Sequence, residues 1–131
     1  MVIDKRVLIQ SAQKAREFAY APYSHFAVGA ALLCKNGKIY TGCNVENAAY
    51  GVSVCAERTA LVKAISEGER SFLAIAVCGS GAEYCTPCGV CRQMLAEFSQ
   101  DIDVFSANEN GAYREDWLYD LLPQSFGREN L

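Results

Sequence analysis

The segment that constrains this chain most is C-T-P-C-G-V-C at residues 85–91, which combines a proline with three thiols. Cys88 and Cys91 lie three residues apart, directly after the proline, at the predicted start of a helix. This spacing is typical of half of a soft-metal site. The best candidate for the missing ligand is Cys55, because it also begins an apolar-periodic segment and is followed two residues later by Glu57. The pattern therefore predicts a metal that takes part in chemistry.

Composition limits the class of protein. With 131 residues, of which 51% are hydrophobic and 21% charged, we expect one domain spanning 1–131 with a true core. The net charge of -3, without a run of Lys or Arg, argues against nucleic acid as a partner. The N-terminus has no leader pattern and no segment approaches a membrane span, so we expect a cytoplasmic protein. Seven cysteines then favour metal binding over a disulfide framework.

The first half of the chain predicts a helix followed by a hairpin. Apolar residues at three- and four-residue spacing indicate an amphipathic helix over 5–19, with Asp4 as its N-cap. Apolar strands over 26–34 and 39–45 flank Asn36-Gly37, which is a strong two-residue turn signal.

Gly29 lies inside the first of these strands. It marks either a bulge or a close approach of another group to the backbone, and a bulge is the commoner case.

The second half predicts alternating helices and strands. Ser53 is expected to cap a helix from 54 to about 67, which Gly68 ends. An apolar run at 72–79 suits a strand covered on both faces. The next helix is expected to open at Thr86 and Pro87, with a core side made by four apolar residues: Val90, Met94, Leu95 and Phe98.

The chain then predicts a strand over 102–107, a turn at 110–111 and a short amphipathic piece over 117–122. The order strand, helix, strand implies a parallel pair with a right-handed crossover. The fold class expected is α/β, with a mixed sheet of about five strands and helices on both faces in three layers.

The thiols lie where the predicted helices begin, and helix N-termini favour thiolates, the form that binds zinc. Three thiolates and one dication leave a formal charge of about -1, so positive neighbours are expected. Arg58 and Arg92 are the candidates to donate to the ligand sulfurs, and the alternative is that they face solvent. A fourth zinc position is then open for a water, with Glu57 as the proton shuttle.

Cys85 leaves a second possibility open. The spacing Cys85-x-x-Cys88-x-x-Cys91, together with Cys55, would also allow a closed site of four thiolates with a structural role. Three cysteines on predicted strands are expected to be small buried apolar residues without chemistry: Cys34, Cys43 and Cys78. His25, the single histidine, is expected at the surface.

Several blocks, taken together, resemble the small zinc-dependent cytidine deaminases, a family whose metal chemistry is well characterised. Cys55-Ala56-Glu57-Arg58 and Pro87-Cys88-Gly89-Val90-Cys91-Arg92-Gln93 carry the metal part of this resemblance. Four further blocks occur in the family's order: Ala21 to Phe26, Gly29 to Ala31, Gly42 to Ala48, and Leu121 to Phe126.

The resemblance implies hydrolytic deamination of cytidine and 2'-deoxycytidine to uridine and 2'-deoxyuridine in pyrimidine salvage. It implies one Zn2+ per chain, held by Cys55, Cys88 and Cys91, and Glu57 as the catalytic acid and base. It also implies a homotetramer with active sites shared between chains. The substrate contacts it implies are Phe26, Asn44, Glu46, Tyr50, Ala56 and Phe126, with the ribose bound by Asn44 and Glu46 and a neighbour's site reached by Phe126 and Tyr50.

Two other functions compete with this interpretation. The first is a binding module stabilised by a structural zinc ion. In such a module the metal would have no open position and Glu57 would have no role. A deaminase of a cytosine antibiotic such as blasticidin S would share the metal motifs, but the ribose pair Asn44 and Glu46 argues against it. Substrate binding by these residues also has an alternative. Asn44 and Glu46 could be ordinary polar loop residues, and Phe26 could belong to the core.

Overall fold

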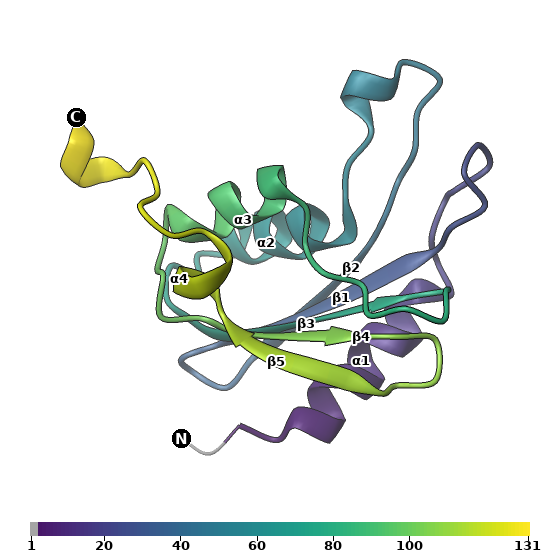
Figure 1. Cartoon of the computed structure of the whole chain (residues 1–131), viewed down its shortest axis with the longest axis horizontal. Coiled ribbons are helices and arrows are strands. Elements are labelled where there is room, and N and C mark those ends of the chain that lie inside the picture. Colours follow the sequence, from purple (N-terminus) through teal and green to yellow (C-terminus); the bar gives the residue numbers. More distant parts are fainter. Residues whose placement is uncertain (1–2) are drawn as a thin grey trace.

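β3, Phe72–Gly79, is the middle strand of a five-stranded sheet in the computed structural model, which describes residues 3–131 (Figure 1). It is buried along almost its whole length because helices cover both faces of the sheet. β3 pairs in parallel with β4, Asp103–Ala107, and antiparallel with β1, Val28–Cys34. The edge strands are β2, Ile39–Cys43, and β5, Tyr113–Trp117. The interpretation of Met1 and Val2 as part of a leaderless N-terminus lies outside the described residues.

The helices form two layers. α1, Lys5–Arg16, covers one face, and α2, Ala56–Ser66, and α3, Gly89–Ala96, cover the other (Figure 1). The remaining helical pieces are α4, Leu118–Leu121, and the two 3-10 turns Tyr50–Val52 and Arg128–Asn130. One apolar cluster fills the space between the sheet and α2 and α3, and a second lies under α1. The predicted three-layer α/β fold with its mixed sheet is confirmed.

Gly29 is explained by a close approach and not by a bulge. The pairing of β1 is regular at this residue, which lies opposite Cys43 on one side and Cys78 on the other. A Cβ at position 29 would lie 2.0 Å from the carbonyl oxygen of Ala12 in α1. The backbone of α1 therefore packs directly on the sheet here, and the expectation of a bulge was wrong.

Both predicted N-termini of the central helices were placed too early. α2 begins at Ala56 with Cys55 as its N-cap, and Ser53 instead accepts a hydrogen bond from the Asn47 amide at 3.0 Å. α3 begins at Gly89 with Cys88 as its N-cap, so Pro87 precedes the helix. The physical reason is shared: in both places the chain stays extended up to the cysteine.

Three further predictions need correction. Val90 is 57% exposed, because the buried side of α3 runs through Cys91 and Leu95, and Val90 lies one residue, about 100°, away from it. α1 ends at Arg16, earlier than the apolar pattern indicated. β5 was not anticipated, because its sequence Y-R-E-D-W is largely exposed on the edge of the sheet and lacks an apolar run.

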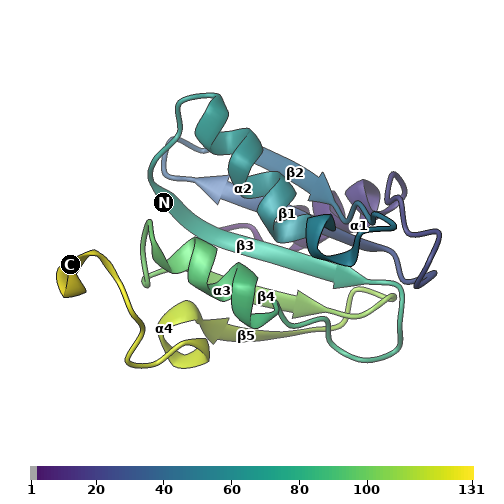
Figure 2. The ribbon, with the colours of Figure 1, turned by 90° about the horizontal axis from the view of Figure 1, so that it is seen from above.

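The arrangement of the elements brings strand ends and helix N-termini together at one end of the sheet. β3 and β4 run in parallel and finish at the end of the sheet where α2 and α3 begin (Figure 2). Loops and helix N-termini at the carboxyl ends of parallel strands are a common location of ligand sites in α/β folds. Within residues 3–131 no helix has the length and apolar character needed to cross a membrane.

Candidate active site

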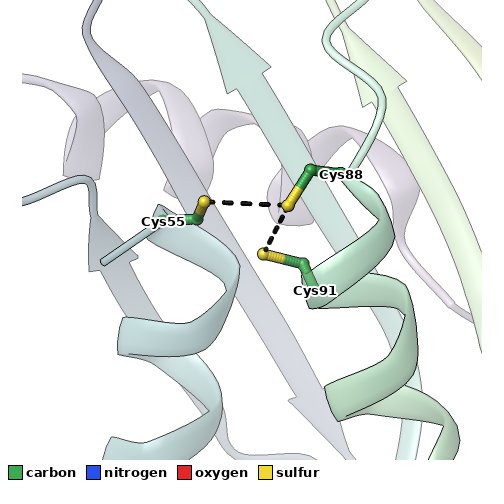
Figure 3. A group of neighbouring side chains, drawn as sticks. All are labelled: Cys55, Cys88 and Cys91. Atoms are coloured by element: carbon green, nitrogen blue, oxygen red, sulfur yellow. Dashed lines mark hydrogen bonds between the residues drawn. The ribbon is translucent and has the colours of Figure 1, made fainter. Parts of the chain in front are cut away.

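Three thiols converge between the first turns of α2 and α3 (Figure 3). Cys55 caps α2, Cys88 caps α3, and Cys91 lies in the first turn of α3. The Cys88 Sγ lies 3.9 Å from the Cys55 Sγ and 3.5 Å from the Cys91 Sγ. All three sulfur atoms lie within 4.8 Å of one another. In the described part of the chain, this is the group of three or more potential ligands that could hold a metal ion.

The spacing of these sulfurs fits zinc. Sulfur ligands about 2.3 Å from a tetrahedral zinc lie about 3.8 Å from one another. The two measured sulfur separations, 3.9 Å and 3.5 Å, lie on either side of that value. Thiolate is also a donor that zinc prefers. The three cysteines therefore fit a zinc ion with three protein ligands.

Hydrogen bonding within the cluster makes Cys55 the first thiolate. A hydrogen bond from the Cys91 thiol lowers the pKa of Cys55 to about 5, and Arg58 lowers it further. The same interaction raises the pKa of Cys91, which keeps its proton while Cys55 is charged. A bound dication would favour the deprotonated form of both.

Arg58 supplies the positive charge next to these sulfurs. Its Nη2 donates to the Cys55 Sγ at 3.7 Å and to the Ser53 carbonyl oxygen at 3.3 Å. Its Nε is buried without a hydrogen-bond partner. A guanidinium held here offsets the negative charge that thiolates bring to the site.

Glu57 is one of two buried polar or charged residues among those described, with 4% of its surface exposed. It lies in the first turn of α2, and its carboxyl group interacts with the Cys91 thiol. Burial raises the pKa of Glu57 to about 7, and the nearby Cys55 raises it further. The structure therefore places a carboxyl group that can exchange a proton near neutral pH beside Cys55 and Cys91.

Arg92 has a different role from the one predicted. Its Nε donates to the Pro87 carbonyl oxygen at 2.7 Å, and its Nη1 donates to the Leu121 carbonyl oxygen at 2.8 Å. These bonds link the segment before α3 to the end of α4. They direct the guanidinium to backbone oxygens, so the expectation that it donates to a ligand sulfur does not agree with this geometry.

Cys85 lies apart from the metal cluster. Its side chain is half-buried against the core, and burial raises the pKa of its thiol to about 12. Its sulfur is not among the three that lie within 4.8 Å of one another, so the geometry does not support a closed four-sulfur site. Of the strand cysteines, Cys34 and Cys78 are buried, and Cys43 is partly exposed.

The residues expected to contact substrate occupy several environments. Ala56 is fully buried at the start of α2, and Phe26 is 41% exposed beside the end of β3. Tyr50 is 78% exposed and stacks edge-on against Tyr23, with ring centroids 6.4 Å apart. Phe126 is 61% exposed in a C-terminal tail that leaves the body of the domain (Figure 2). Phe126 is thus not part of the core of its own chain.

Asn44 and Glu46 hold the loop that carries Phe26. The Asn44 Oδ1 accepts from the Val28 amide at 2.8 Å, and its Nδ2 donates to the Phe26 carbonyl oxygen at 2.8 Å. The Glu46 Oε1 accepts from the amides of Tyr23 and Ser24 at 3.0 Å and 3.1 Å. Sequence reasoning missed these bonds because no local signal reveals which distant backbone groups a loop side chain will meet.

Comparison with known proteins adds to this geometry. Residues 3–107 match the model of the cytidine and deoxycytidylate deaminase zinc-binding region. The chain belongs to this deaminase family. It is 49% identical over 130 residues to a cytidine deaminase of Sporosarcina psychrophila, with 98% of this chain and 96% of that protein covered. It is 48% identical over 130 residues to one of Halalkalibacterium halodurans, with 98% of each covered.

Solved structures agree with the sequence relatives. A crystal structure of a cytidine deaminase from Burkholderia pseudomallei superposes with a TM-score of 0.91 at 48% identity. The match covers 95% of this chain and all of that one. The family's zinc-binding region and the cluster of three cysteines confirm the zinc cofactor that the deaminase motifs predicted.

The separation of Cys85 from the cluster predicts how zinc content responds to substitution. Cys85→Ser should retain one zinc per chain, because the three ligand sulfurs are untouched. Cys88→Ser, the matched control on the same segment, should lose most of its zinc, because only two thiolates remain. Zinc per chain is measured by mass spectrometry of the metal after dialysis. Loss of zinc in Cys85→Ser would contradict the three-sulfur assignment.

Proposed function

We propose that this chain is a zinc-dependent hydrolase that deaminates cytidine and 2'-deoxycytidine, producing uridine or 2'-deoxyuridine and ammonia. The observation that carries the proposal is the buried carboxyl group of Glu57 beside Cys55 and Cys91, two members of the cluster of three cysteines. A purely structural zinc site gives a buried glutamate no purpose. Membership of the deaminase family supports the same reaction.

Glu57 acts as the proton carrier. When bound, zinc supplies the Lewis acidity that makes water a nucleophile near neutral pH. Glu57 accepts a proton from the attacking water and delivers it to N3 of the cytosine ring, and it then carries the proton of the new C4 hydroxyl group to the leaving amino group. Ammonia departs and the carbonyl of uridine remains. Burial of Glu57 excludes bulk water, which would otherwise compete for these protons.

Asn44 and Glu46 bind the ribose through the hydrogen-bonding capacity that their loop contacts leave. One oxygen of Glu46 already accepts two amide hydrogens, which leaves the other oxygen as an acceptor. The Asn44 amide uses one hydrogen for the Phe26 carbonyl, which leaves the second as a donor. A hydroxyl that donates to Glu46 and accepts from Asn44 satisfies both. One hydroxyl is enough, so both cytidine and 2'-deoxycytidine are substrates.

Three residues complete the nucleoside site. Phe26 packs its exposed ring against the nucleoside, and Ala56 lines the site at the start of α2. Arg58 stays outside the reacting atoms and tunes the metal through the Cys55 sulfur. Because the ribose pair is present, a nucleoside fits better than blasticidin S.

The cellular setting follows from the reaction. Residues 1–131 act as one deaminase domain in the cytoplasm, where free nucleosides are recovered for pyrimidine salvage. Neither a membrane nor a nucleic acid is a partner, in keeping with the net charge of -3.

The active form is a homotetramer in which neighbouring chains complete each other's sites. Phe126 and Tyr50 are large aromatic residues that their own chain leaves 61% and 78% exposed. The Gln93 side chain holds the tail by donating to the Phe126 carbonyl oxygen at 2.9 Å, while the ring remains uncovered. Exposed aromatic residues of this kind are typical anchors of protein interfaces.

Glu57→Gln tests the chemistry directly. The variant should bind one zinc per chain, because the sulfurs are unchanged, but lose a factor of about 10²–10⁴ or more in kcat because an amide cannot carry the proton. Turnover is followed as the fall in ultraviolet absorbance with cytidine, 2'-deoxycytidine and blasticidin S assayed in parallel. Normal turnover by Glu57→Gln, or no turnover of either nucleoside by the unmodified zinc-loaded protein, would overturn the proposal.

Phe126→Ala tests the shared site. Loss of an aromatic contact should lower kcat/KM roughly ten-fold. Leu131→Ala is the matched control, because Leu131 lies in the same tail, is 97% exposed and has no proposed role. Activity is measured along a dilution series together with mass by light scattering. A monomer with full activity at low concentration would contradict the shared-site arrangement.

A further inference from the structure

The ring of Phe26 lies directly on two glycines at the end of β3. A Cβ at Gly79 would lie 2.8 Å from the Phe26 Cζ, and a Cβ at Gly81 would lie 3.1 Å from the Phe26 Cε1. Neither glycine has a positive φ, so backbone conformation does not require glycine at either position. At Gly81 the contacts of such a Cβ within 4 Å would be with the Phe26 ring, whereas at Gly79 the Cys85 Cβ and Sγ would also lie close, at 3.0 Å and 3.2 Å.

The backbone beside the ring is held by side chains. The Ala27 amide donates to the Ser80 Oγ at 3.0 Å, and the Phe26 amide donates to the Ser24 Oγ at 3.0 Å. Asn44 accepts from the Val28 amide and donates to the Phe26 carbonyl oxygen. The segment therefore has a fixed path, and Ser80 lies between the two glycines that receive the ring.

The location of this segment connects it to the active site. The Cβ of Gly79 would also lie 3.0 Å from the Cys85 Cβ, so the Phe26 ring tip and Cys85 meet at the same point. Cys85 opens the segment that continues to Cys88 and Cys91. Phe26 thus lies against the residue that begins the segment leading to the metal cluster, and 41% of its surface is exposed.

We propose that Gly79, Ser80 and Gly81, together the Phe26 seat, are positioning residues that fix the Phe26 ring in the orientation that receives the nucleoside. This inference rests on the proposed function of Phe26. A half-exposed aromatic ring free to change rotamer would lose that freedom on binding, which weakens affinity. The two glycines leave room for the Cζ and Cε1 end of the ring beside the end of β3, and the Ser80 hydroxyl fixes the backbone that carries it.

A Cβ at position 81 would meet the Phe26 ring and, among the described residues outside its chain neighbours, no other group within 4 Å, so the ring is the group that moves when position 81 gains a side chain. Gly81→Ala and then Gly81→Val should raise KM for cytidine progressively, the latter roughly ten-fold, within the range of about 5- to 150-fold that loss of an aromatic–base stack causes. The dissociation constant for uridine, measured by titration calorimetry, should rise in parallel. Because zinc and Glu57 are untouched, kcat should change much less than KM.

Ser80→Ala tests the backbone part of the seat. Removal of the hydroxyl takes the acceptor from the Ala27 amide and should raise KM and the uridine dissociation constant several-fold. Ser66→Ala is the matched control, because its hydroxyl bonds to the Val62 carbonyl oxygen within α2, far along that helix from the cluster. Its kinetic constants should equal those of the unmodified enzyme.

A double-mutant cycle separates positioning from a general loss of packing. If Gly81 acts through Phe26, then Gly81→Val should have no further effect on KM or on uridine affinity in a Phe26→Ala background. Zinc content and the midpoint of thermal unfolding show whether each variant is folded. Native KM and uridine affinity in Gly81→Val, or equal effects with and without Phe26, would overturn the proposal.

The two levels of proposal fail differently. If the unmodified protein does not turn over cytidine or bind uridine, the proposed function fails. If it does both and the cycle shows no coupling between Gly81 and Phe26, only the seat fails.

Discussion

The rest of this structure depends on two helix N-termini that lie side by side at one end of the sheet. α2 and α3 start beside each other because both follow extended segments at the end where β3 and β4 finish. Their caps are Cys55 and Cys88, and the first turn of α3 adds Cys91. A helix N-terminus stabilises negative charge, so these are favourable positions for thiolates. Three sulfurs at the separation that zinc requires are a consequence of this layout.

The same layout decides what surrounds the metal. The residues that follow Cys55 enter the first turn of α2, which buries Glu57 against the sulfurs and directs Arg58 back to the Cys55 Sγ. A short motif therefore provides a candidate metal ligand, a buried carboxyl group and a compensating positive charge. Close packing of α1 at Gly29 and of α2 at Gly42, where a Cβ would lie 2.6 Å from the Ala56 carbonyl oxygen, fixes these helices on the sheet.

Local signals explain where sequence reasoning succeeded. β3 was predicted to the residue because a continuous apolar run of strand length between two helices has one reasonable interpretation. The cluster of three cysteines was predicted from the spacing of Cys88 and Cys91 and from the position of Cys55 at a predicted helix start, two residues before Glu57. The missed features depend on contacts between distant segments: β5 is an exposed edge strand, and Arg92 bonds to the carbonyl of Leu121, 29 residues away. The close packing at Gly29 likewise needed the position of α1 on the sheet.

Zinc held by three sulfurs with one open position is the central claim, and X-ray absorption spectroscopy at the zinc edge of the loaded protein tests it most directly. The account predicts three sulfur neighbours at about 2.3 Å and one oxygen or nitrogen neighbour at about 2.0 Å. The light neighbour should be replaced or shifted when a transition-state analogue of cytidine deamination binds. A first shell of four sulfurs that does not respond to the analogue would contradict the account.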